Sequence, residues 1–418
     1  MKQSKYNILL QKGNRKLVFN QLTASVIELD GELFHCLEQN DIDSIPEEVR
    51  ESLFDSSILV KDDLNEKNVL MYKLHRAKYA DKSTRVTIMP TLDCNFKCWY
   101  CYEKHHKSEM TPDSLESLLI FCQTLIEKDN VNSFHLDWFG GEPLLHFFDV
   151  VYPVASKLKK LCNLNHKTFF HSITTNGYLI NDKMISKMKD ICLSSFQITL
   201  DGAAFFHNKT RFTKDDKDSY SKIVGNMINL CRNIPNISMT MRINYTPRNV
   251  ESLLEIIADF PMDVRGKISV CPQLVWQFKK NINATTRKIK SILLEFQNAG
   301  FLPHRQSLTC HQCYAESMNQ YVVNYDLSVF KCTARDFSAI HSVGKIADGV
   351  FIPNSHYFDY SIPTDVIDEQ CKECQLLPSC LGRCVQKRVE GSAKNCDKDS
   401  LRLSVINDVL LYMNANER

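Results

Sequence analysis

The stretch 93–103 reads DCNFKCWYCYE and brings three cysteines, Cys94, Cys98 and Cys101, within eight residues. Their spacing, C-x3-C-x2-C, supplies three thiolate ligands from one loop. Structural zinc and iron–sulfur sites are usually closed by four protein ligands. Three ligands leave one coordination position open, and a [4Fe–4S] cluster held in this way exposes one iron. We therefore expect a metal centre whose open position takes a substrate or a cofactor.

Two other interpretations of these cysteines are open. Zinc ligands usually come as a C-x2-4-C pair followed by a second pair, and no second cysteine pair of that spacing follows before Cys310. Three buried core cysteines are the structural alternative, because a free cysteine packs like a small hydrophobic residue. The polar run DCNFKC argues against a continuous buried strand. The spacing therefore favours an open metal site.

The composition is that of an ordinary folded protein, with 418 residues, of which 44% are hydrophobic and 24% charged. This length predicts two or three domains. The net charge of +2 gives no reason to expect a nucleic-acid partner. The N-terminus lacks the apolar core of a signal peptide, and no run approaches the roughly 20 apolar residues of a membrane span. We expect a cytoplasmic protein without a membrane partner, whose 17 cysteines are core residues or metal ligands rather than disulfides.

Strand-like and helix-like segments alternate from residue 85 to about residue 300. Helical spacing of apolar residues marks several of them, such as 114–128. Six others are β-branched and apolar, as is typical of strands, and they are 85–93, 133–140, 168–177, 195–202, 237–245 and 267–275. This alternation predicts βαβ units with a parallel sheet, whose strands all end on one rim. The first strand runs directly into the cysteine loop.

The motif CNFKCWYC at 94–101 resembles the C-x3-C-x-aromatic-C signature of radical S-adenosylmethionine (SAM) enzymes. The resemblance implies that the amino and carboxylate groups of SAM chelate the open iron. One electron from the cluster then cleaves SAM to methionine and a 5′-deoxyadenosyl radical, which abstracts hydrogen from the substrate. The six strand-like segments match the α/β fold of this family, a partial (β/α)6 TIM-like barrel, here over residues 85–300.

The rim of this barrel carries motifs that the family places around SAM. GGEP (140–143), TTNG (174–177), TLDG (199–202) and MRIN (241–244) end successive strands. In the family, GGEP contacts the SAM amino group, and groups near Thr199 and Arg211 point toward the SAM carboxylate. An arginine fork matches a carboxylate in geometry. The implied cofactor-binding residues are Tyr100, Gly140, Gly141, Glu142, Pro143, Thr175, Asn176, Thr199, Asp201, Arg211 and Arg242.

The C-terminal part is rich in cysteine, with eight between Cys310 and Cys396. The run CKECQLLPSCLGRC (371–384) has the spacing C-x2-C-x5-C-x3-C. A zinc ribbon is an alternative, since two C-x2-C pairs can bind one zinc ion, but eight thiols exceed its need. The run resembles the SPASM extension, which carries auxiliary [4Fe–4S] clusters in radical SAM enzymes that act on peptides. Residues 305–418 are therefore expected to form a cysteine-rich SPASM domain.

The SPASM resemblance implies two auxiliary clusters, and hence three [4Fe–4S] clusters in all. It assigns the distal cluster to Cys371, Cys374, Cys380 and Cys396. It assigns the nearer one to Cys313, Cys332 and Cys384, with Cys310 as a candidate fourth ligand. Two departures concern the nearer cluster: Leu327 stands where the family pattern has glycine, and 18 residues separate Cys313 from Cys332. This cluster has either three or four protein ligands, and both electron relay and substrate ligation are open roles.

Residues 1–80 carry no cysteine motif. YNILLQ and KLVFNQ flank a KGN turn and predict a hairpin, 25–39 and 45–54 predict helices, and 57–63 predicts a returning strand. This order resembles the small α+β, winged-helix-like recognition element (RRE-like) that precedes the barrel in many peptide-modifying SPASM enzymes. That element takes up the leader of a precursor peptide as an added strand. A scaffold that closes the open side of the barrel is the alternative.

Together these resemblances imply a radical SAM maturase that installs a crosslink, by resemblance a thioether, in a ribosomally synthesised precursor peptide (RiPP) with a leader. An electron donor such as flavodoxin or ferredoxin would reduce it. The alternatives are a carbon–carbon crosslinking maturase, an anaerobic sulfatase-maturating enzyme that forms formylglycine, and a non-catalytic peptide-binding partner. Sulfatase-maturating enzymes usually carry Asp directly after the cysteine that matches Cys332, where this chain has Thr333, with Asp336 three residues further on. The intact cysteine triad and GGEP argue against a non-catalytic protein.

Overall fold

The computed structural model describes residues 1–213, 215–278, 283–303, 308, 313–334, 336–361, 369–382, 384–390 and 396–416. The chain divides into two compact units. The first comprises residues 1–80, 305–318 and 362–418, and the second comprises residues 81–304 and 319–361. The chain therefore passes repeatedly between a small unit and a large one.

The large unit is built on an eleven-stranded sheet with the order β12-β11-β10-β9-β8-β7-β6-β13-β14-β15-β16. Six neighbouring strands in it are parallel: β6 (Ser83–Ile88), β7 (Ser133–Trp138), β8 (Thr168–Thr175), β9 (Ser195–Leu200), β10 (Ser238–Tyr245) and β11 (Ile268–Leu274). A short β12 (Leu302–Pro303) extends them in parallel. The six strands confirm the six strand-like segments of the sequence, and their ends share one rim.

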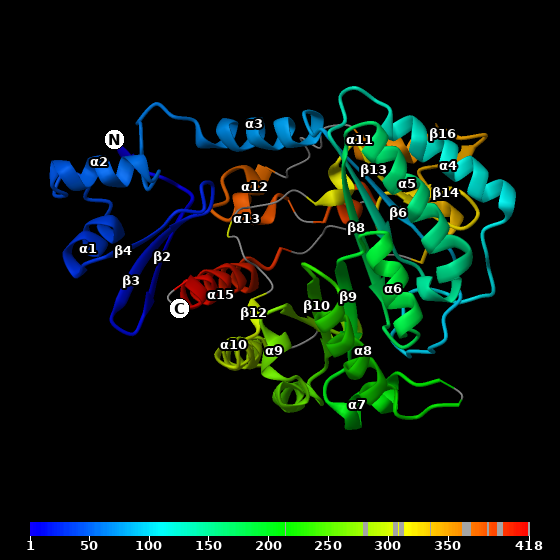
Figure 1. Ribbon diagram of the computed structural model, residues 1–418. Helices are drawn as coiled ribbons and strands as arrows, with labels where there is room; N and C mark the ends of the chain where they lie inside the picture. Colours follow the sequence, from blue (N-terminus) through cyan, green and yellow to red (C-terminus); the bar gives the residue numbers. More distant parts are fainter. Residues whose placement is uncertain are drawn as a thin grey trace. The chain divides into compact units, whose positions relative to one another are not determined.

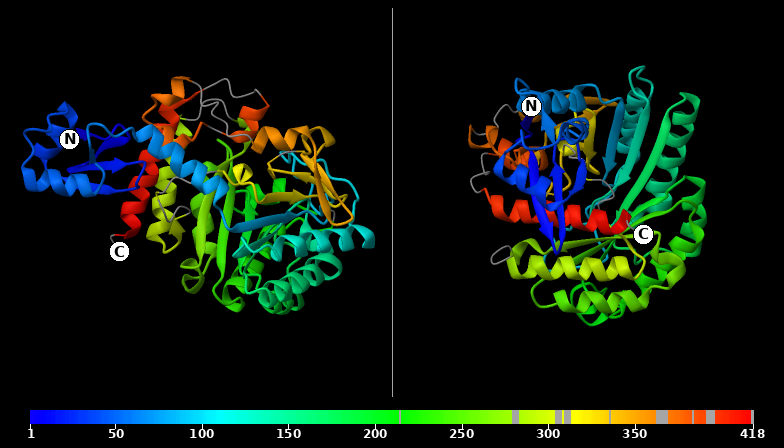
Figure 2. Two further views of the ribbon diagram at one scale, coloured as in Figure 1. Left: turned by 90° about the horizontal axis from the view of Figure 1, so that it is seen from above. Right: turned by 90° about the vertical axis from the view of Figure 1, so that its left-hand side faces the viewer.

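Helices connect the parallel strands: α4 (Pro112–Ile126), α5 (Tyr152–Leu164), α6 (Asp182–Asp190), α7 (Ala204–Thr210), α8 (Ser219–Asn233), α9 (Met262–Arg265) and α10 (Asn283–Asn298). Four further segments complete the connections: the 3-10 helices η1 (Pro143–His146), η3 (Val250–Asp259) and η4 (Trp276–Phe278), and the π-helix η2 (Phe147–Val151). Figure 1 shows α4, α5 and α6 on one side of the sheet, and Figure 2 shows the helices following its curve. The arrangement confirms alternating βα units.

The strands alternate between an apolar and a polar face. In β7, Phe134, Leu136 and Trp138 are buried, whereas His135 and Asp137 between them are half-buried. Successive side chains of a strand point to opposite faces, so one face of this strand packs and the other remains polar. Trp138 satisfies its indole by donating a hydrogen bond of 2.7 Å to Nε2 of buried His171 on β8.

Beyond β6 the sheet continues with β13 (Gln320–Val323), β14 (Ser328–Phe330), β15 (Gly344–Ala347) and β16 (Val350–Pro353). β13 is parallel to β6, and the remaining three pair in antiparallel fashion. These strands, followed by α11 (Ser355–Ser361), belong to the large unit although they lie within 305–418. Leu327, in the turn from β13 to β14, has φ of 65°, a left-handed conformation that favours glycine. The family pattern has glycine at this position.

The small unit begins with a three-stranded antiparallel sheet of β2 (Asn7–Lys12), β3 (Arg15–Asn20) and β4 (Val26–Leu29). β1 (Lys2–Gln3) pairs with β5 (Leu59–Val60), and helices α1 (Gly31–Gln39), α2 (Glu47–Asp55) and α3 (Glu66–Tyr79) complete this part. The helix expected over 25–39 is wrong in its first half, which forms β4. The Asp30 carboxylate accepts a hydrogen bond of 2.8 Å from Leu33 N, and this cap starts the helix only at Gly31.

The C-terminal part of the small unit contains α12 (Glu369–Lys372), α13 (Leu377–Cys380), α14 (Val385–Val389) and α15 (Lys398–Asn416), after a short turn η5 (Tyr314–Glu316). Val405, Val409 and Leu410 of α15 form one apolar cluster with Ile8 and Leu17 of the hairpin. The first and last segments of the chain therefore share a core within this unit.

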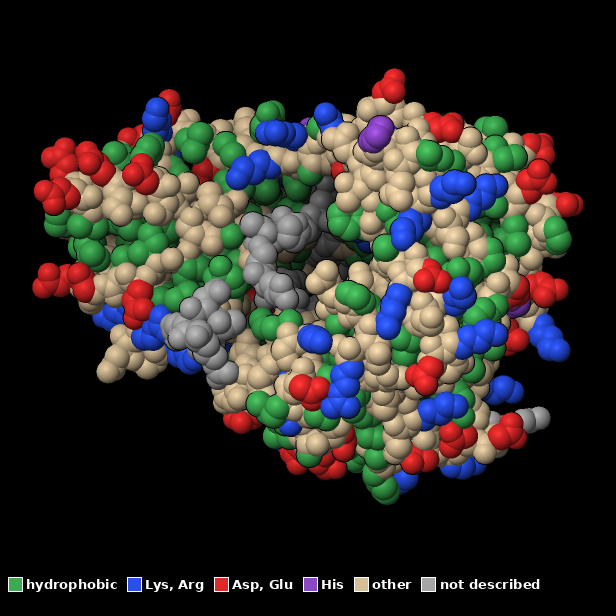
Figure 3. All heavy atoms as spheres, in the orientation of Figure 1, with side chains coloured by type: hydrophobic (Ala, Val, Ile, Leu, Met, Phe, Trp, Pro, Cys, Tyr) green, Lys and Arg blue, Asp and Glu red, His purple; other side chains and the backbone are tan. Residues whose placement is uncertain are grey.

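The face shown in Figure 3 gives the distribution of charged side chains on each unit. In Figure 3, acidic side chains gather over α1 and α2, whereas charges of both signs are mixed over the large unit. Within the described ranges, every helix is too short or too polar to cross a lipid bilayer.

Candidate functional site

The three cysteines of the motif lie on the loop that leaves the end of β6. None of their thiols is in a disulfide, and each side chain is half-buried. Cys94 Sγ accepts hydrogen bonds from Phe96 N (3.4 Å) and Asn176 Nδ2 (3.9 Å). Burial raises the pKa of each thiol, so the loop would carry neutral thiols until a metal ion stabilises the thiolates.

The donor chemistry of this loop fits a thiolate-bound iron–sulfur cluster, which takes Cys ligands and N–H···S hydrogen bonds. Across the described parts of the chain, however, no three Cys, His, Asp or Glu side chains are already gathered as a metal-binding group. A cluster here therefore requires the three thiols to turn toward one another, which a loop of three closely spaced cysteines allows.

Two glycines after β7 allow the cysteine loop to pass close by. A Cβ at Gly140 would lie 2.5 Å from Thr91 O, and φ there is 107°. A Cβ at Gly141 would lie 2.1 Å from Asp93 O. Real Cβ atoms essentially never come closer than 3.0 Å. Both glycines are thus required by the backbone that leads into Cys94, a contact within the chain itself.

Glu142 is almost fully buried and joins two of the rim motifs. Its carboxylate accepts hydrogen bonds from Thr175 Oγ1 (2.6 Å), Asn176 N (2.8 Å) and Leu144 N (3.0 Å). Burial raises its pKa, and these three donors oppose that rise by stabilising the charged form. Glu142 therefore fastens TTNG to GGEP. Asn176 in turn donates to Asn95 Oδ1 (2.7 Å), inside the cysteine loop.

A second polar network connects the cysteine loop with β9 and β10. Tyr100 Oη donates to the Asp201 carboxylate at 2.7 Å and accepts from Arg211 Nη1 and Asn244 Nδ2, each at 3.0 Å. Asn244 also accepts from Arg242 Nε at 3.0 Å. Residues from four separate motifs of the sequence therefore meet here.

Arg211 is the buried cation of this network. Its Nη1 lies 3.9 Å from Asp201 Oδ1, and its guanidinium lies over the Phe96 ring at 5.4 Å. Its Nε is buried and has no hydrogen-bond acceptor among the described residues. An orphaned donor of a buried guanidinium is costly unless an acceptor arrives, so this position fits an anionic ligand group such as a carboxylate.

A cavity of about 380 Å³ opens beside this network. Its polar wall includes Tyr100, Asp201 and Asn244. Three aromatic side chains line it as well, and they are Trp99, Phe206 and Phe278. The wall also contains polar and charged residues, among them Lys209 and Arg248, and cavities of a few hundred Å³ that combine aromatic with polar groups suit small-molecule ligands. The cysteine loop thus forms part of the wall of a ligand-sized space.

The remaining residues of the predicted SAM site lie on the same rim. Thr199 of β9 is buried and pairs in register with Arg242 of β10. Pro143 is buried at the start of η1. Sequence reasoning missed the aromatic residues of the cavity, although Trp99 stands inside the motif itself. Phe206 and Phe278 lie in segments without a recognisable signature.

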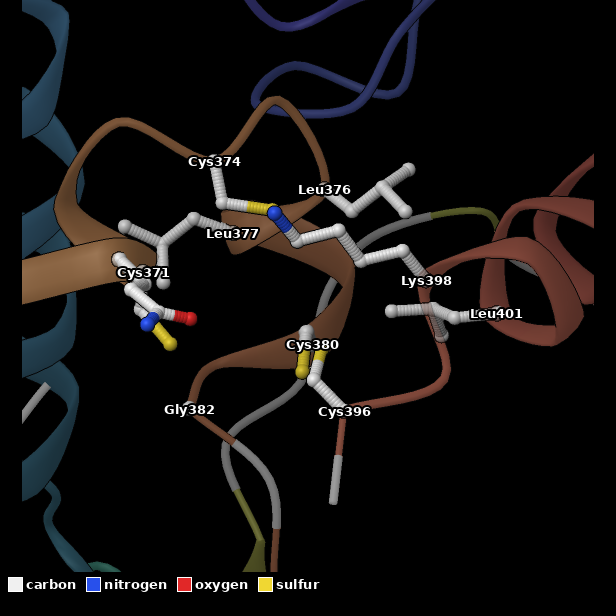
Figure 4. A pocket seen from close by; sticks show the side chains of 10 residues that line it. Cys371, Cys374, Leu376, Leu377, Cys380, Gly382, Cys396, Lys398 and Leu401 are labelled. Carbon is white, nitrogen blue, oxygen red and sulfur yellow. The ribbon is translucent and has the colours of Figure 1, made fainter. Parts of the chain in front are cut away.

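The C-terminal cysteines lie in the small unit, where Cys371, Cys374, Cys380 and Cys396 line one pocket. Figure 4 shows the sulfurs of Cys380 and Cys396 beside each other and the Lys398 amine pointing to Cys374. The four cysteines assigned to the distal cluster therefore line one pocket, although the described residues do not gather three of them into a formed metal-binding group.

The residues assigned to the nearer cluster are divided between the two units. Cys313 and Cys384 are exposed residues of the small unit, Cys332 is buried in the large unit, and Cys310 lies outside the described residues. The six cysteines outside the motif and the C-terminal group are expected to be mostly core residues. Cys122, Cys162, Cys231 and Cys271 are buried and Cys36 is half-buried, but Cys192 is exposed, so the core assignment is wrong for Cys192.

The carboxylate near Cys332 is engaged locally. Asp336 Oδ1 accepts from Ser338 Oγ at 2.9 Å and lies 3.5 Å from His341 Nε2. These contacts stabilise its own turn.

Residues 88–260 match the sequence model of the Radical SAM superfamily. An uncharacterised protein, sll1766, of Synechocystis is 32% identical over 143 residues, which is 32% of this chain and 35% of that protein. A cysteine-type anaerobic sulfatase-maturating enzyme of Clostridium novyi is 30% identical over 157 residues, or 35% of this chain and 40% of the enzyme. The chain thus spans less than half the length of these curated relatives.

Two solved structures have the same fold. The structure of anSMEcpe with bound AdoMet and Cp18Cys peptide has a TM-score of 0.61 at 18% identity and covers 80% of this chain and 99% of that chain. The structure of Streptococcus suis SuiB bound to precursor peptide SuiA has a TM-score of 0.52 at 16% identity, over 96% of this chain and 99% of that chain. At this identity the likeness establishes the fold alone.

Proposed function

Because residues 88–260 are a radical SAM domain, we propose that the protein is an enzyme that cleaves SAM reductively and modifies a peptide made on the ribosome. When bound, SAM and a [4Fe–4S] cluster supply a carbon radical that abstracts hydrogen from the substrate. The observation that carries the proposal is the cysteine loop, because its residues Trp99 and Tyr100 form part of the wall of a 380 Å³ cavity.

In this proposal the residues of the rim have different roles. Cys94, Cys98 and Cys101 hold the cluster, and the Arg211 guanidinium, with its orphaned Nε, binds the SAM carboxylate. Glu142 has three hydrogen-bond donors of its own and holds the GGEP and TTNG loops together. The family motif assigns Gly140, Gly141 and Pro143 to the amino end of SAM, and Thr175, Asn176, Thr199 and Arg242 complete the rim.

The small unit carries two further parts of the proposal. Cys371, Cys374, Cys380 and Cys396 hold a distal auxiliary [4Fe–4S] cluster, as in a SPASM domain, and their shared pocket supports this. Cys313, Cys332 and Cys384, with Cys310 as a candidate, hold the nearer one. Three clusters then relay electrons, with flavodoxin or ferredoxin as the donor class. Residues 1–80 bind the leader of the precursor through the edge of the β2–β4 sheet.

Iron counting tests the cofactor assignment. Three clusters correspond to about twelve irons per chain after anaerobic reconstitution. Replacing Cys94, Cys98 and Cys101 together by Ala should remove about four of them and abolish formation of 5′-deoxyadenosine. The single variant Cys192→Ala, at an exposed cysteine outside every motif, should lose neither. If the triple variant still produces 5′-deoxyadenosine, the assignment is wrong, and stoichiometric zinc with little iron would favour a zinc ribbon.

The bond formed is assigned to a thioether. The deoxyadenosyl radical would take one hydrogen atom from a carbon, and the thiol would give up its proton. As the carbon–sulfur bond forms, one electron would pass to an auxiliary cluster, so the peptide would lose two hydrogens in all. The two fold relatives whose structures hold peptides support a peptide substrate. A sulfatase-maturating activity is the second candidate, because a relative of that activity is 30% identical over 157 residues. Thr333 in the place of Asp counts against it.

Mass measurement before and after alkylation separates these chemistries. A thioether product has lost two hydrogens, keeps its sulfur and resists alkylation. A carbon–carbon crosslink has lost two hydrogens, yet every thiol still reacts. Formylglycine from Cys has lost its sulfur and reacts with hydrazine as an aldehyde. Blocked thiols are the expected result, and a hydrazine-reactive product would replace the proposal with sulfatase maturation.

Leader recognition is best tested on the full chain. Removing residues 1–80 would uncover the apolar cluster that α15 shares with the hairpin, so a truncated protein would lose more than a binding edge. Binding of a precursor with and without its leader should differ for the full chain. Equal affinity of both peptides would leave residues 1–80 as a scaffold.

A further inference from the structure

The hydroxyl of Tyr100 is saturated by groups of the chain itself. It donates to Asp201 and accepts from Arg211 and Asn244, at 2.7, 3.0 and 3.0 Å. A phenol hydroxyl offers one donor and two acceptor positions. Because all three are filled, this hydroxyl has no hydrogen bond left to offer a ligand. Any contact of Tyr100 with a cofactor must then come from its ring or its backbone.

The backbone of the same residue is fastened as well. Tyr100 O accepts hydrogen bonds from Gln277 Nε2 (3.1 Å) and Trp276 Nε1 (3.4 Å), both in η4, which follows β11. Tyr100 stands between Cys98 and Cys101, whose own turn is closed by a hydrogen bond of 3.1 Å from Cys101 N to Cys98 O. The segment that carries two of the three thiols is thus tied to the ends of three strands through one residue.

We propose that Tyr100 is a positioning residue whose hydroxyl fixes the Cys98–Cys101 segment against the wall of the 380 Å³ cavity. The inference rests on the proposed function, because the object that is positioned is the cluster that would cleave SAM. The hydroxyl acts by bridging Asp201 and Arg211, whose closest charged atoms are otherwise 3.9 Å apart. A reacting pair displaced by about 1 Å loses on the order of 100-fold in rate, so such an anchor has a catalytic consequence.

The bridge also controls the ligand side of Arg211. With Nη1 directed to Tyr100, the guanidinium is held in one orientation and its Nε remains buried without an acceptor. The Tyr100 hydroxyl lies 2.7 Å from both carboxylate oxygens of Asp201 and is the donor of this hydrogen bond. Loss of this hydroxyl would free both the loop and the arginine, and SAM binding should weaken together with the change at the cluster.

The variant Tyr100→Phe separates hydrogen bonding from packing, because the phenyl ring fills the same space. Tyr102→Phe is the matched control: it removes a hydroxyl from the same loop, where Tyr102 Oη donates to Thr333 O at 3.1 Å in an exposed position. SAM affinity is measured by equilibrium dialysis on the reconstituted protein. The environment of the cluster is read from the electron paramagnetic resonance spectrum of the reduced protein, with and without SAM.

Tyr100→Phe should weaken SAM binding about 10- to 100-fold, the usual loss for a hydrogen bond to a charged group, and should shift and broaden the spectrum of the SAM-bound cluster. Tyr102→Phe should match the wild type in both measurements. If the two variants behave alike, the inference is overturned while the proposed function stands. If the wild type itself neither holds iron nor binds SAM, the proposed function fails, and this inference fails with it.

A second variant keeps the test decisive if Tyr100→Phe does not fold. Asp201→Asn keeps the shape of the acceptor but removes its charge, and it should shift the same spectrum in the same direction. The effects of Tyr100→Phe and Asp201→Asn should be strongly non-additive, because both act on one hydrogen bond. Wild-type affinity and spectrum in Asp201→Asn would overturn the inference.

Discussion

Gly141→Ala is the sharpest test of how the barrel holds its cysteine loop. The new methyl group would lie 2.1 Å from Asp93 O and 2.6 Å from both Asp93 C and Leu92 O. All three are backbone atoms, so no side chain can rotate out of the way. The Asp93 oxygen would have to retreat from 2.1 Å to at least 3.4 Å for an ordinary contact. The cysteine loop must therefore move.

The loss of stability follows from the backbone hydrogen bonds that this movement would break. Asp93 O accepts a hydrogen bond of 2.8 Å from Glu142 N, and Thr91 O accepts one of 3.1 Å from Gly141 N. Overpacking costs about 1–3 kcal/mol, and a lost backbone hydrogen bond adds about 1 kcal/mol. We expect Gly141→Ala to lower the unfolding free energy of the large unit by about 2–4 kcal/mol and to reduce iron retention at Cys94.

The assay is urea unfolding followed by tryptophan fluorescence. All three tryptophans, Trp99, Trp138 and Trp276, belong to the large unit, so the signal reports that unit. Gly225→Ala in α8 is the control, because its Cβ would meet nothing within 4 Å, and Ala favours a helix over Gly by about 1 kcal/mol. If Gly141→Ala unfolds at the same urea concentration as the wild type and retains the same amount of iron, the reasoning from close approach is refuted.

Three further predictions address other parts of the molecule. Burial lowers the pKa of His171 to about 4, so the folded state excludes its proton. Stability should be level above pH 6.5 and fall by roughly 3 kcal/mol as the pH drops from 6.5 to 4, and His171→Gln should flatten this slope in fluorescence-monitored urea titrations. Arg388→Met removes a buried ion pair with Glu316 (2.6 Å) and should cost the small unit about 3–5 kcal/mol in calorimetry. Arg211→Gln should weaken SAM binding in dialysis by about 10- to 100-fold, whereas Arg232→Gln, in an exposed pair, should not.

The parallel strands could be predicted because their signal is local. Each is a short apolar run, and its neighbours in the sheet follow in chain order, from β6 to β11. The continuation of the sheet by β13–β16 could not be predicted in this way. β13 pairs with β6 across more than 230 residues, and the sequence of its four residues does not indicate which strand it pairs with. Periodicity also missed the boundary at Asp30, because a single cap outweighed the apolar pattern around it.

The site was predictable in its residues but not in its contacts. Motifs at strand ends indicated Glu142, Asp201 and Arg211. That Tyr100 joins residues up to 177 positions away depends on how the strand ends converge, which the sequence does not display. The family motif assigned the glycine pair to SAM, and the structure shows in addition that the backbone of the preceding strand loop requires both glycines. Leu327 was a departure from the family pattern, yet its backbone adopts the conformation that glycine favours.

The pairing of β6 with β13 has a consequence for how parts of this chain can be exchanged with those of relatives. β6 would be the outermost strand of the half-barrel if the chain ended after β12, and its loop would then hang from an edge. β6 pairs with β7 on one side and with β13 on the other. The strand that carries the cysteine loop therefore pairs with residues that come more than 230 positions later in the chain. Residues 305–418 are therefore not a cassette that can be exchanged between relatives at a linker. A chimera joined near residue 304 would also replace the strand beside its own cysteine loop, and exchange should succeed only where the junctions leave 319–361 with the barrel.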